Sequence, residues 1–128
     1  METMKNTIDI KFLENFSAAW NKHDIDALMS FMTDDCIFET AAGNHVYGNR
    51  FTGHEQVRKA FESAWIQFPD AQWLDASHSV FGDNGISEWR FFGTDLKGVK
   101  LEANGVDVFT FKDGKIFKKN VFRKQISS

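Results

Sequence analysis

The stretch GVDVFTFKDGKI, residues 105–116, combines a β-strand pattern with a tight turn, and it decides how the C-terminal half of the chain folds. Apolar and β-branched residues dominate it up to Phe111, and Gly114 supplies the positive φ angle that a hairpin needs where its strands reverse. One carboxylate, Asp107, stands within this apolar strand. Because burial of an unpaired charge costs several kcal/mol, we expect Asp107 to have a partner, to lose its charge or to contact water.

The neighbouring segments predict an α+β domain with helices first and strands after. Helical periodicity covers about residues 7–21, Asp24 is the expected N-cap of a short second helix, and Thr52-Gly53-His54-Glu55 has the capping-box pattern for a third helix that ends at Pro69. Strands are expected at 36–40, 71–81, 86–94, 99–111 and 115–125, with a loop or weak hairpin at 41–51 and a bulge or bend at Gly105. Three helices would then cover one face of a strongly curved antiparallel sheet.

Composition places the chain among globular proteins of one domain, residues 1–128. It has 42% hydrophobic and 26% charged residues, and its 14 Phe suit a large core or an apolar pocket. A net charge of −3 argues against a general nucleic-acid binder, and no apolar run is long enough for a membrane span. The single Cys36 excludes an intrachain disulfide, and we expect a cytoplasmic location.

Two motifs, AAWNKHDIDALMSFMTDDCIFE at 18–39 and GVDVFTFKDGKI at 105–116, make the chain resemble the nuclear transport factor 2-like superfamily. That group includes ketosteroid isomerases, SnoaL-like polyketide cyclases, scytalone dehydratase and limonene-epoxide hydrolase. The resemblance covers about residues 8–124. It implies a cone-shaped α+β barrel that encloses an apolar pocket, and a homodimer formed through the sheet. We expect no metal and no organic cofactor. Fold alone does not define an activity, so function must come from the pocket residues.

The resemblance gives Asp107 a candidate role as the carboxyl group that faces the pocket. In ketosteroid isomerases the equivalent strand carries an Asp that donates a hydrogen bond to the substrate oxyanion. The other catalytic positions differ, because Thr40 stands at the place of the general base and Phe16 at the place of the tyrosine donor. Val121 stands where an epoxide hydrolase carries an Asp. The isomerase and epoxide-hydrolase mechanisms therefore do not transfer intact.

The partner of Asp107 depends on the length of the hairpin loop that follows it. A three-residue loop, Lys112-Asp113-Gly114, would place Asp107 opposite Lys119, and a two-residue loop would place it opposite Asn120. We favour Lys119, because the resemblance also turns Lys119, Val121 and Arg123 inward. A lysine partner would keep the carboxylate charged, and an asparagine would leave it free to act as a neutral donor or a base.

Further residues are expected to shape the pocket. Trp89 is the predicted pocket wall on the strand that also carries Ser87 and Phe91. We expect Phe38 and Thr40 to line the pocket from the first strand, and His45 is an alternative acid or base near the pocket mouth.

Lys and Arg residues also crowd the C-terminal end, as a solvated hairpin face or as a contact for an anionic ligand or partner. Two hypotheses follow. The first is a cofactor-independent isomerase, dehydratase or cyclase for a small hydrophobic or aromatic metabolite, with Asp107 and Lys119 catalytic; the second is a non-catalytic ligand-binding or dimerisation module.

Overall fold

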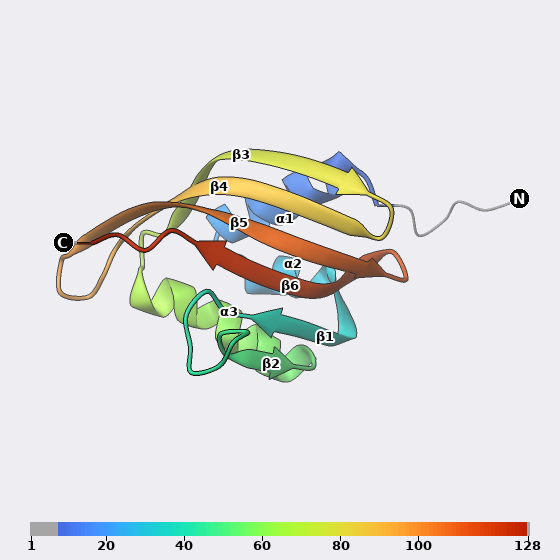
Figure 1. Ribbon diagram of the computed structural model, residues 1–128, viewed down its shortest axis with the longest axis horizontal. Helices are drawn as coiled ribbons and strands as arrows, with labels where there is room; N and C mark the ends of the chain where they lie inside the picture. The colour runs from blue at the N-terminus through green and yellow to red at the C-terminus, as the bar shows by residue number, and fades with distance from the viewer. Residues whose placement is uncertain (1–7, 128) are drawn as a thin grey trace, which may run out of the picture.

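The computed structural model describes residues 8–127 and contains three helices and six strands (Figure 1). In chain order they are α1 Ile10–Asn21, α2 Ile25–Ser30, β1 Met32–Glu39, β2 Arg50–Thr52, α3 His54–Gln67, β3 Gln72–Phe81, β4 Asn84–Thr94, β5 Lys100–Lys112 and β6 Lys115–Arg123. No helix within these described residues is both long enough and apolar enough to cross a bilayer.

The first two helices begin where short polar side chains can satisfy free backbone amides. The Asp9 carboxylate accepts a hydrogen bond from the Phe12 amide at the start of α1, and Asp24 accepts one from Ala27 at the start of α2. Asp24 is therefore confirmed as an N-cap, and α1 begins at Ile10. The predicted start of the helix at about Thr7 lies outside the described residues.

The capping box predicted for α3 is wrong. Gly53 is the N-cap residue, with φ of 85°, and it has no side chain to accept a hydrogen bond. Thr52 instead belongs to β2, and its amide donates to the Gln56 side-chain oxygen at 3.1 Å. A side chain of the first helical turn still reaches back, as in a capping box, but it comes from Gln56 and not from Glu55.

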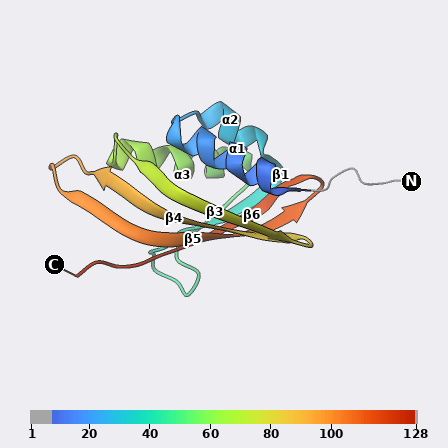
Figure 2. The same cartoon turned by 90° about the horizontal axis from the view of Figure 1, so that it is seen from above.

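The six strands form one sheet in the order β2-β1-β6-β5-β4-β3. All three helices lie on one side of this strongly curved sheet, which we call its inner face (Figure 2). The predicted α+β fold of three helices on a curved sheet is confirmed. The sheet is mixed, however, because β1 pairs in parallel with β6, and it does not close into a complete barrel.

The β5–β6 hairpin has a register that neither sequence alternative predicted. Asp113 and Gly114 form a two-residue loop with φ of 55° and 73°, as in a type I′ turn. The register then shifts by one residue between the pairs Phe111–Ile116 and Thr110–Lys118, with Phe117 as the extra residue on β6. Asp107 consequently lies opposite Val121. Lys119 lies opposite Phe109, so it is a diagonal neighbour of Asp107 on the same face.

Two further details of the sheet decide which side chains face the helices. Residues an odd number of positions apart on a regular strand face opposite sides of the sheet. Asp75 adopts φ of 55° where the β3–β4 register shifts, and as a result both Trp73 and His78, five positions apart, pair with inner-face residues of β4, namely Phe91 and Ser87. Gly105, predicted to form a bulge, pairs regularly with Trp89. The predicted bulge is therefore wrong, and a Cβ atom at Gly105 would lie 2.4 Å from the Trp89 ring, so this glycine is required for close packing.

Candidate functional site

Asp107 and Lys119 form an ion pair on the inner face of the sheet. Lys119 Nζ lies 3.1 Å from Asp107 Oδ1, and the side chains of Lys119 and Asp107 are only 6% and 9% exposed. Trp89 Nε1 donates a hydrogen bond to the other carboxylate oxygen at 3.1 Å. The partner predicted by the favoured loop length is therefore present, although it arrives through a diagonal contact and not through direct pairing.

Aromatic rings surround the Lys119 ammonium group. Its nitrogen lies 5.1 Å from the ring centre of Trp20, 4.8 Å from that of Phe38 and 5.6 Å from that of Phe61. Cation–π attraction and the Asp107 carboxylate together offset the loss of water around this buried charge. The ammonium group has three N–H donors and the Asp107 carboxylate at 3.1 Å can accept one of them, so the others remain available to a bound molecule.

A second titratable group is linked to the ion pair through Ser87. His78 Nδ1 lies 2.7 Å from Ser87 Oγ, and Ser87 pairs with Asp107 across the β4–β5 ladder. Burial lowers the pKa of His78, while the negative charges of Glu14 and Asp107 oppose this effect. The contact between His78 and Ser87 was not predicted from the sequence.

Two cavities meet at the ion pair. The inner one has a volume of about 20 Å³, which is enough for a single water, and its lining includes Asp107, Ser87 and Phe16. The second cavity is larger, with a volume of about 380 Å³, and lies on the same inner face of the sheet, between it, α3 and the 40–49 loop. Trp20, Trp73, Trp89 and Lys119 line both cavities and so form the wall between them.

The larger cavity is mostly aromatic and apolar. Its residues come from α1, the β1–β2 region, α3 with the residue after it, and strands β3, β4 and β6 of the sheet, and they are Trp20, Phe38, Thr40, Ala41, Ala42, Asn49, Phe51, Ala60, Ser63, Ala64, Gln67, Phe68, Trp73, Trp89, Phe91, Lys119, Val121 and Arg123. Its size and lining are those of a small-molecule site. Lys119 supplies the charged group at its inner end, and Asp107 lies behind Lys119, outside the lining of this cavity.

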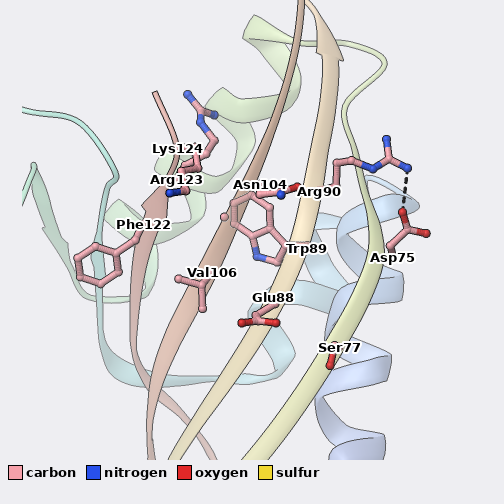
Figure 3. Close-up of a pocket in the computed structure, with 11 residues that line it drawn as sticks. Asp75, Ser77, Glu88, Trp89, Arg90, Asn104, Val106, Phe122, Arg123 and Lys124 are labelled. Carbon is pink, nitrogen blue, oxygen red and sulfur yellow. Dashed lines mark hydrogen bonds and ion pairs between the residues drawn. The ribbon is translucent and has the colours of Figure 1, made fainter. Parts of the chain in front are cut away.

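The outer face of the sheet carries a wider hollow of about 600 Å³ (Figure 3). Its lining includes Arg90, which forms ion pairs with Asp75 and Glu102, and also Val106 and Phe122. Neither Asp107 nor Lys119 lines it. We therefore assign the candidate active site to the cavity on the inner face, where charge and apolar walls converge.

Most of the residues predicted for the pocket lie at one of the two inner cavities. Lys119 and Trp89 line both, Asp107 and Phe16 line the small one, and the large one includes Phe38, Thr40 and Val121. The Thr40 hydroxyl donates to the Ala42 carbonyl and accepts from the Asn49 amide, so it holds the loop in shape.

Two predicted pocket residues lie elsewhere. Asn120 pairs with Val108, and because side chains alternate along a strand, this pairing turns it to the face opposite Asp107. His45 stacks on Tyr47 in the 40–49 loop, is exposed, and lines neither inner cavity. The extra residue on β6, Phe117, is the physical reason why Asn120 faces away from Asp107.

Several cavity residues were not predicted from the sequence. Trp73 was missed because the irregularity at Asp75 breaks the alternation of β3. Ala60, Ser63 and Gln67 were missed because a short or polar helical residue carries no sign that it faces a cavity. Among described residues 8–127, no three His, Cys, Asp or Glu side chains are grouped as metal ligands would be.

The sequence matches the family model described as "SnoaL-like domain" over residues 13–119. The chain therefore belongs to the SnoaL-like domain family, and its resemblance to the nuclear transport factor 2-like superfamily is confirmed. A comparison with curated proteins gave no match.

Solved structures with the same fold include proteins that are described as having different functions. A proposed polyketide cyclase from Xanthomonas campestris pv. campestris is 18% identical, with coverage of 88% of this chain and 87% of that chain and a TM-score of 0.77. TerC, co-crystallised with polyporic acid, is 18% identical, with coverage of 90% of each chain and a TM-score of 0.76. An NTF2-like protein from Mesorhizobium loti is 22% identical, covers 90% of this chain and 89% of its own, and has a TM-score of 0.73. At these identities the similarity establishes the fold alone.

Proposed function

We propose that this protein binds a small hydrophobic or aromatic metabolite in the 380 Å³ cavity and catalyses a cofactor-independent acid–base reaction on it, of the isomerase, dehydratase or cyclase type. The observation that carries the proposal is the buried Lys119 ammonium group, which lies at the inner end of an aromatic cavity and has Asp107 as its one carboxylate partner among residues 8–127. Two similarly folded proteins, the proposed cyclase and the one crystallised with polyporic acid, add support.

The ion pair suggests how the reaction would be assisted. Lys119 would give a proton to a substrate oxygen, and its neutral amine would then take the proton from a neighbouring carbon, so that a keto group becomes an enol and the lysine ends charged again. Asp107 would hold the ammonium group in place and balance its charge. Exclusion of water by the surrounding tryptophan rings strengthens each of these interactions.

A thermal-shift screen of hydrophobic ring compounds tests the binding part of this proposal. A ligand present at 100 times its Kd stabilises the native state by about 2.7 kcal/mol, which corresponds to a rise of several degrees in Tm for a domain of this size. Ala64→Phe, which would fill the cavity, should abolish the shift. Ile66→Phe enlarges an exposed side chain of the same helix that does not line the cavity, and it should leave the shift unchanged. Equal shifts in both variants would contradict binding in the cavity.

A second candidate function is ligand binding without catalysis. The observation that favours it is the small size of the inner cavity, about 20 Å³, which holds no substrate-sized group beside Asp107. The two functions are separated by following a confirmed ligand over time with the wild-type protein and with Asp107→Asn. Catalysis predicts conversion in the wild type and a loss of at least about 100-fold in a folded Asp107→Asn variant. A ligand that is bound but never converted would support a binding module.

We also propose that two chains form a homodimer through the outer face of the sheet, in a cytoplasmic protein. This face exposes the apolar ring of Phe122 beside Val106, and it carries both Glu88 and Lys124, neither of which forms an ion pair within residues 8–127 (Figure 3). A face with apolar groups and charges of both signs can pair with a copy of itself about a two-fold axis. Light scattering should give a dimer for the wild type and a monomer for Phe122→Glu; a monomeric wild type would contradict this interface.

A further inference from the structure

The charge balance of the large cavity is positive. Its lining contains two cationic side chains, Lys119 and Arg123, and no Asp or Glu residue. Asp107, which lies behind the wall of the cavity, compensates Lys119 across 3.1 Å. One positive charge, that of Arg123, is therefore left without a carboxylate partner among residues 8–127.

The position of Arg123 connects this remaining charge to the aromatic lining. Arg123 pairs with Gly105 at the end of β6, and its guanidinium carbon lies 5.4 Å from the centre of the Phe91 ring, which lines the same cavity. Arg123 is exposed, whereas Lys119 is buried. The two cations therefore mark the outer and inner ends of one aromatic site.

The charges of two neighbouring lysines are balanced by carboxylates outside the cavity. Lys112 forms an ion pair with Asp35, and Lys118 forms one with the buried Glu39, which also binds Arg50. These pairs lie outside the lining of the cavity. The excess of basic residues near the C-terminal end is thus neutralised in part by structural pairs, and Arg123 is the member of this group that faces the cavity without such a partner in residues 8–127.

We propose that the natural ligand is an aromatic monoanion: its ring system fills the space between Trp20, Phe38 and Trp73, and its carboxylate, sulfonate or ionised enol group is bound by Arg123. This inference rests on the proposed binding function and adds the chemical class of the ligand. A planar guanidinium group pairs well with such an anion, because it offers two parallel N–H donors. A polar oxygen at the other end of the ligand would meet the free N–H groups of Lys119.

Two fluorescent probes of nearly equal shape test the charge preference. Anilinonaphthalene sulfonate carries one negative charge, and phenylnaphthylamine is its uncharged analogue. Energy transfer from tryptophan reports that a probe is bound, and its loss in Ala64→Phe assigns the probe to the cavity, because Trp89 lines the outer-face hollow as well. A cavity without an available cation would favour the uncharged probe, because transfer of an ion out of water is unfavourable. We expect the anionic probe to bind at least about tenfold more tightly.

The variant Arg123→Gln should weaken binding of the anionic probe by about tenfold and leave binding of the uncharged probe within about twofold of wild type. Arg123 and Lys124 both line the outer-face hollow, but only Arg123 also lines the cavity, so Lys124→Gln is the matched control for binding at the hollow. It should change neither affinity. Equal binding of both probes, or equal weakening of both by Arg123→Gln, would overturn the ligand class and leave the binding function standing. Failure of both probes to bind would overturn the binding function and this inference together.

Discussion

The ion pair between Asp107 and Lys119 should show strong energetic coupling when its members are removed singly and together. At 3.1 Å and an effective dielectric constant of about 20, the attraction between the two charges is about 5 kcal/mol. Desolvation of both groups offsets much of this attraction in the intact pair. Removal of one partner leaves the other charge buried and uncompensated, which destabilises a protein by about 3–5 kcal/mol.

We therefore expect Lys119→Met and Asp107→Asn each to lower the free energy of unfolding by about 3–5 kcal/mol. The double variant should lie within about 2 kcal/mol of wild type, because the side-chain amide introduced by Asp107→Asn still accepts from Trp89 Nε1 and no buried charge remains. Urea denaturation with a shared m-value measures all four proteins. Single variants that each lose under about 1 kcal/mol, with additive effects, would refute the reasoning.

An exposed ion pair elsewhere in the molecule provides the control for this cycle. Arg58 contacts Asp26 at 2.7 Å, but the side chains are 41% and 83% exposed. Surface pairs of this kind contribute about 0–1 kcal/mol, because water and salt screen them. The coupling energy of Arg58→Met with Asp26→Asn should thus be several times smaller than that of the buried pair, although its atoms are closer together.

Three further perturbations test separate parts of the structure. Gly105→Ala should destabilise the fold by about 1–3 kcal/mol and change tryptophan fluorescence, because the new methyl group would overlap the Trp89 ring; wild-type stability in urea would contradict this packing. Burial raises the pKa of the Cys36 thiol to about 11, so a thiol reagent should modify it only after unfolding, and rapid labelling of the native protein would be the contrary result. Burial also lowers the pKa of His78, so the unfolded state binds this proton more readily and stability should fall as pH drops below about 6.5. His78→Asn should make that fall in unfolding free energy shallower, and an unchanged slope would argue against burial of a neutral imidazole.

The sequence predicted the parts of the fold that depend on simple periodicity. Alternation along β4 identified Ser87, Trp89 and Phe91 as one face, and all three are buried. The apolar stripe of α1 identified Phe16 and Trp20 as core residues in the same way. Such patterns are reliable because a half-buried helix or strand must place its apolar residues on one side.

The details that failed all involve local departures from periodicity. One extra residue on β6, Phe117, moved Asp107 to a position opposite Val121, and a positive φ at Asp75 brought Trp73 into the cavity wall. Each irregularity affects one residue, so its sequence signal is weak, yet each changes which side chains face the helices. The pair of Asp107 with Lys119 was nevertheless predicted correctly, because a long lysine side chain reaches a diagonal neighbour as readily as a direct one.

The division of the pocket into two cavities also could not be predicted from the sequence. It depends on how three tryptophans from α1, β3 and β4 meet around Lys119. Their packing places Lys119 in contact with the large cavity and keeps Asp107 behind it. The order of the two groups, with the ammonium nearer to the ligand than the carboxylate, is a property of side-chain packing across elements that are far apart in the chain.

A crystal structure of the protein with the most stabilising aromatic ring compound would test the central claim most directly. We predict that the rings lie between α3 and the inner face of the sheet, with a ligand oxygen within hydrogen-bond distance of Lys119 Nζ. Ligand density confined to the outer-face hollow, or rings in the cavity with no polar atom near Lys119, would contradict the account.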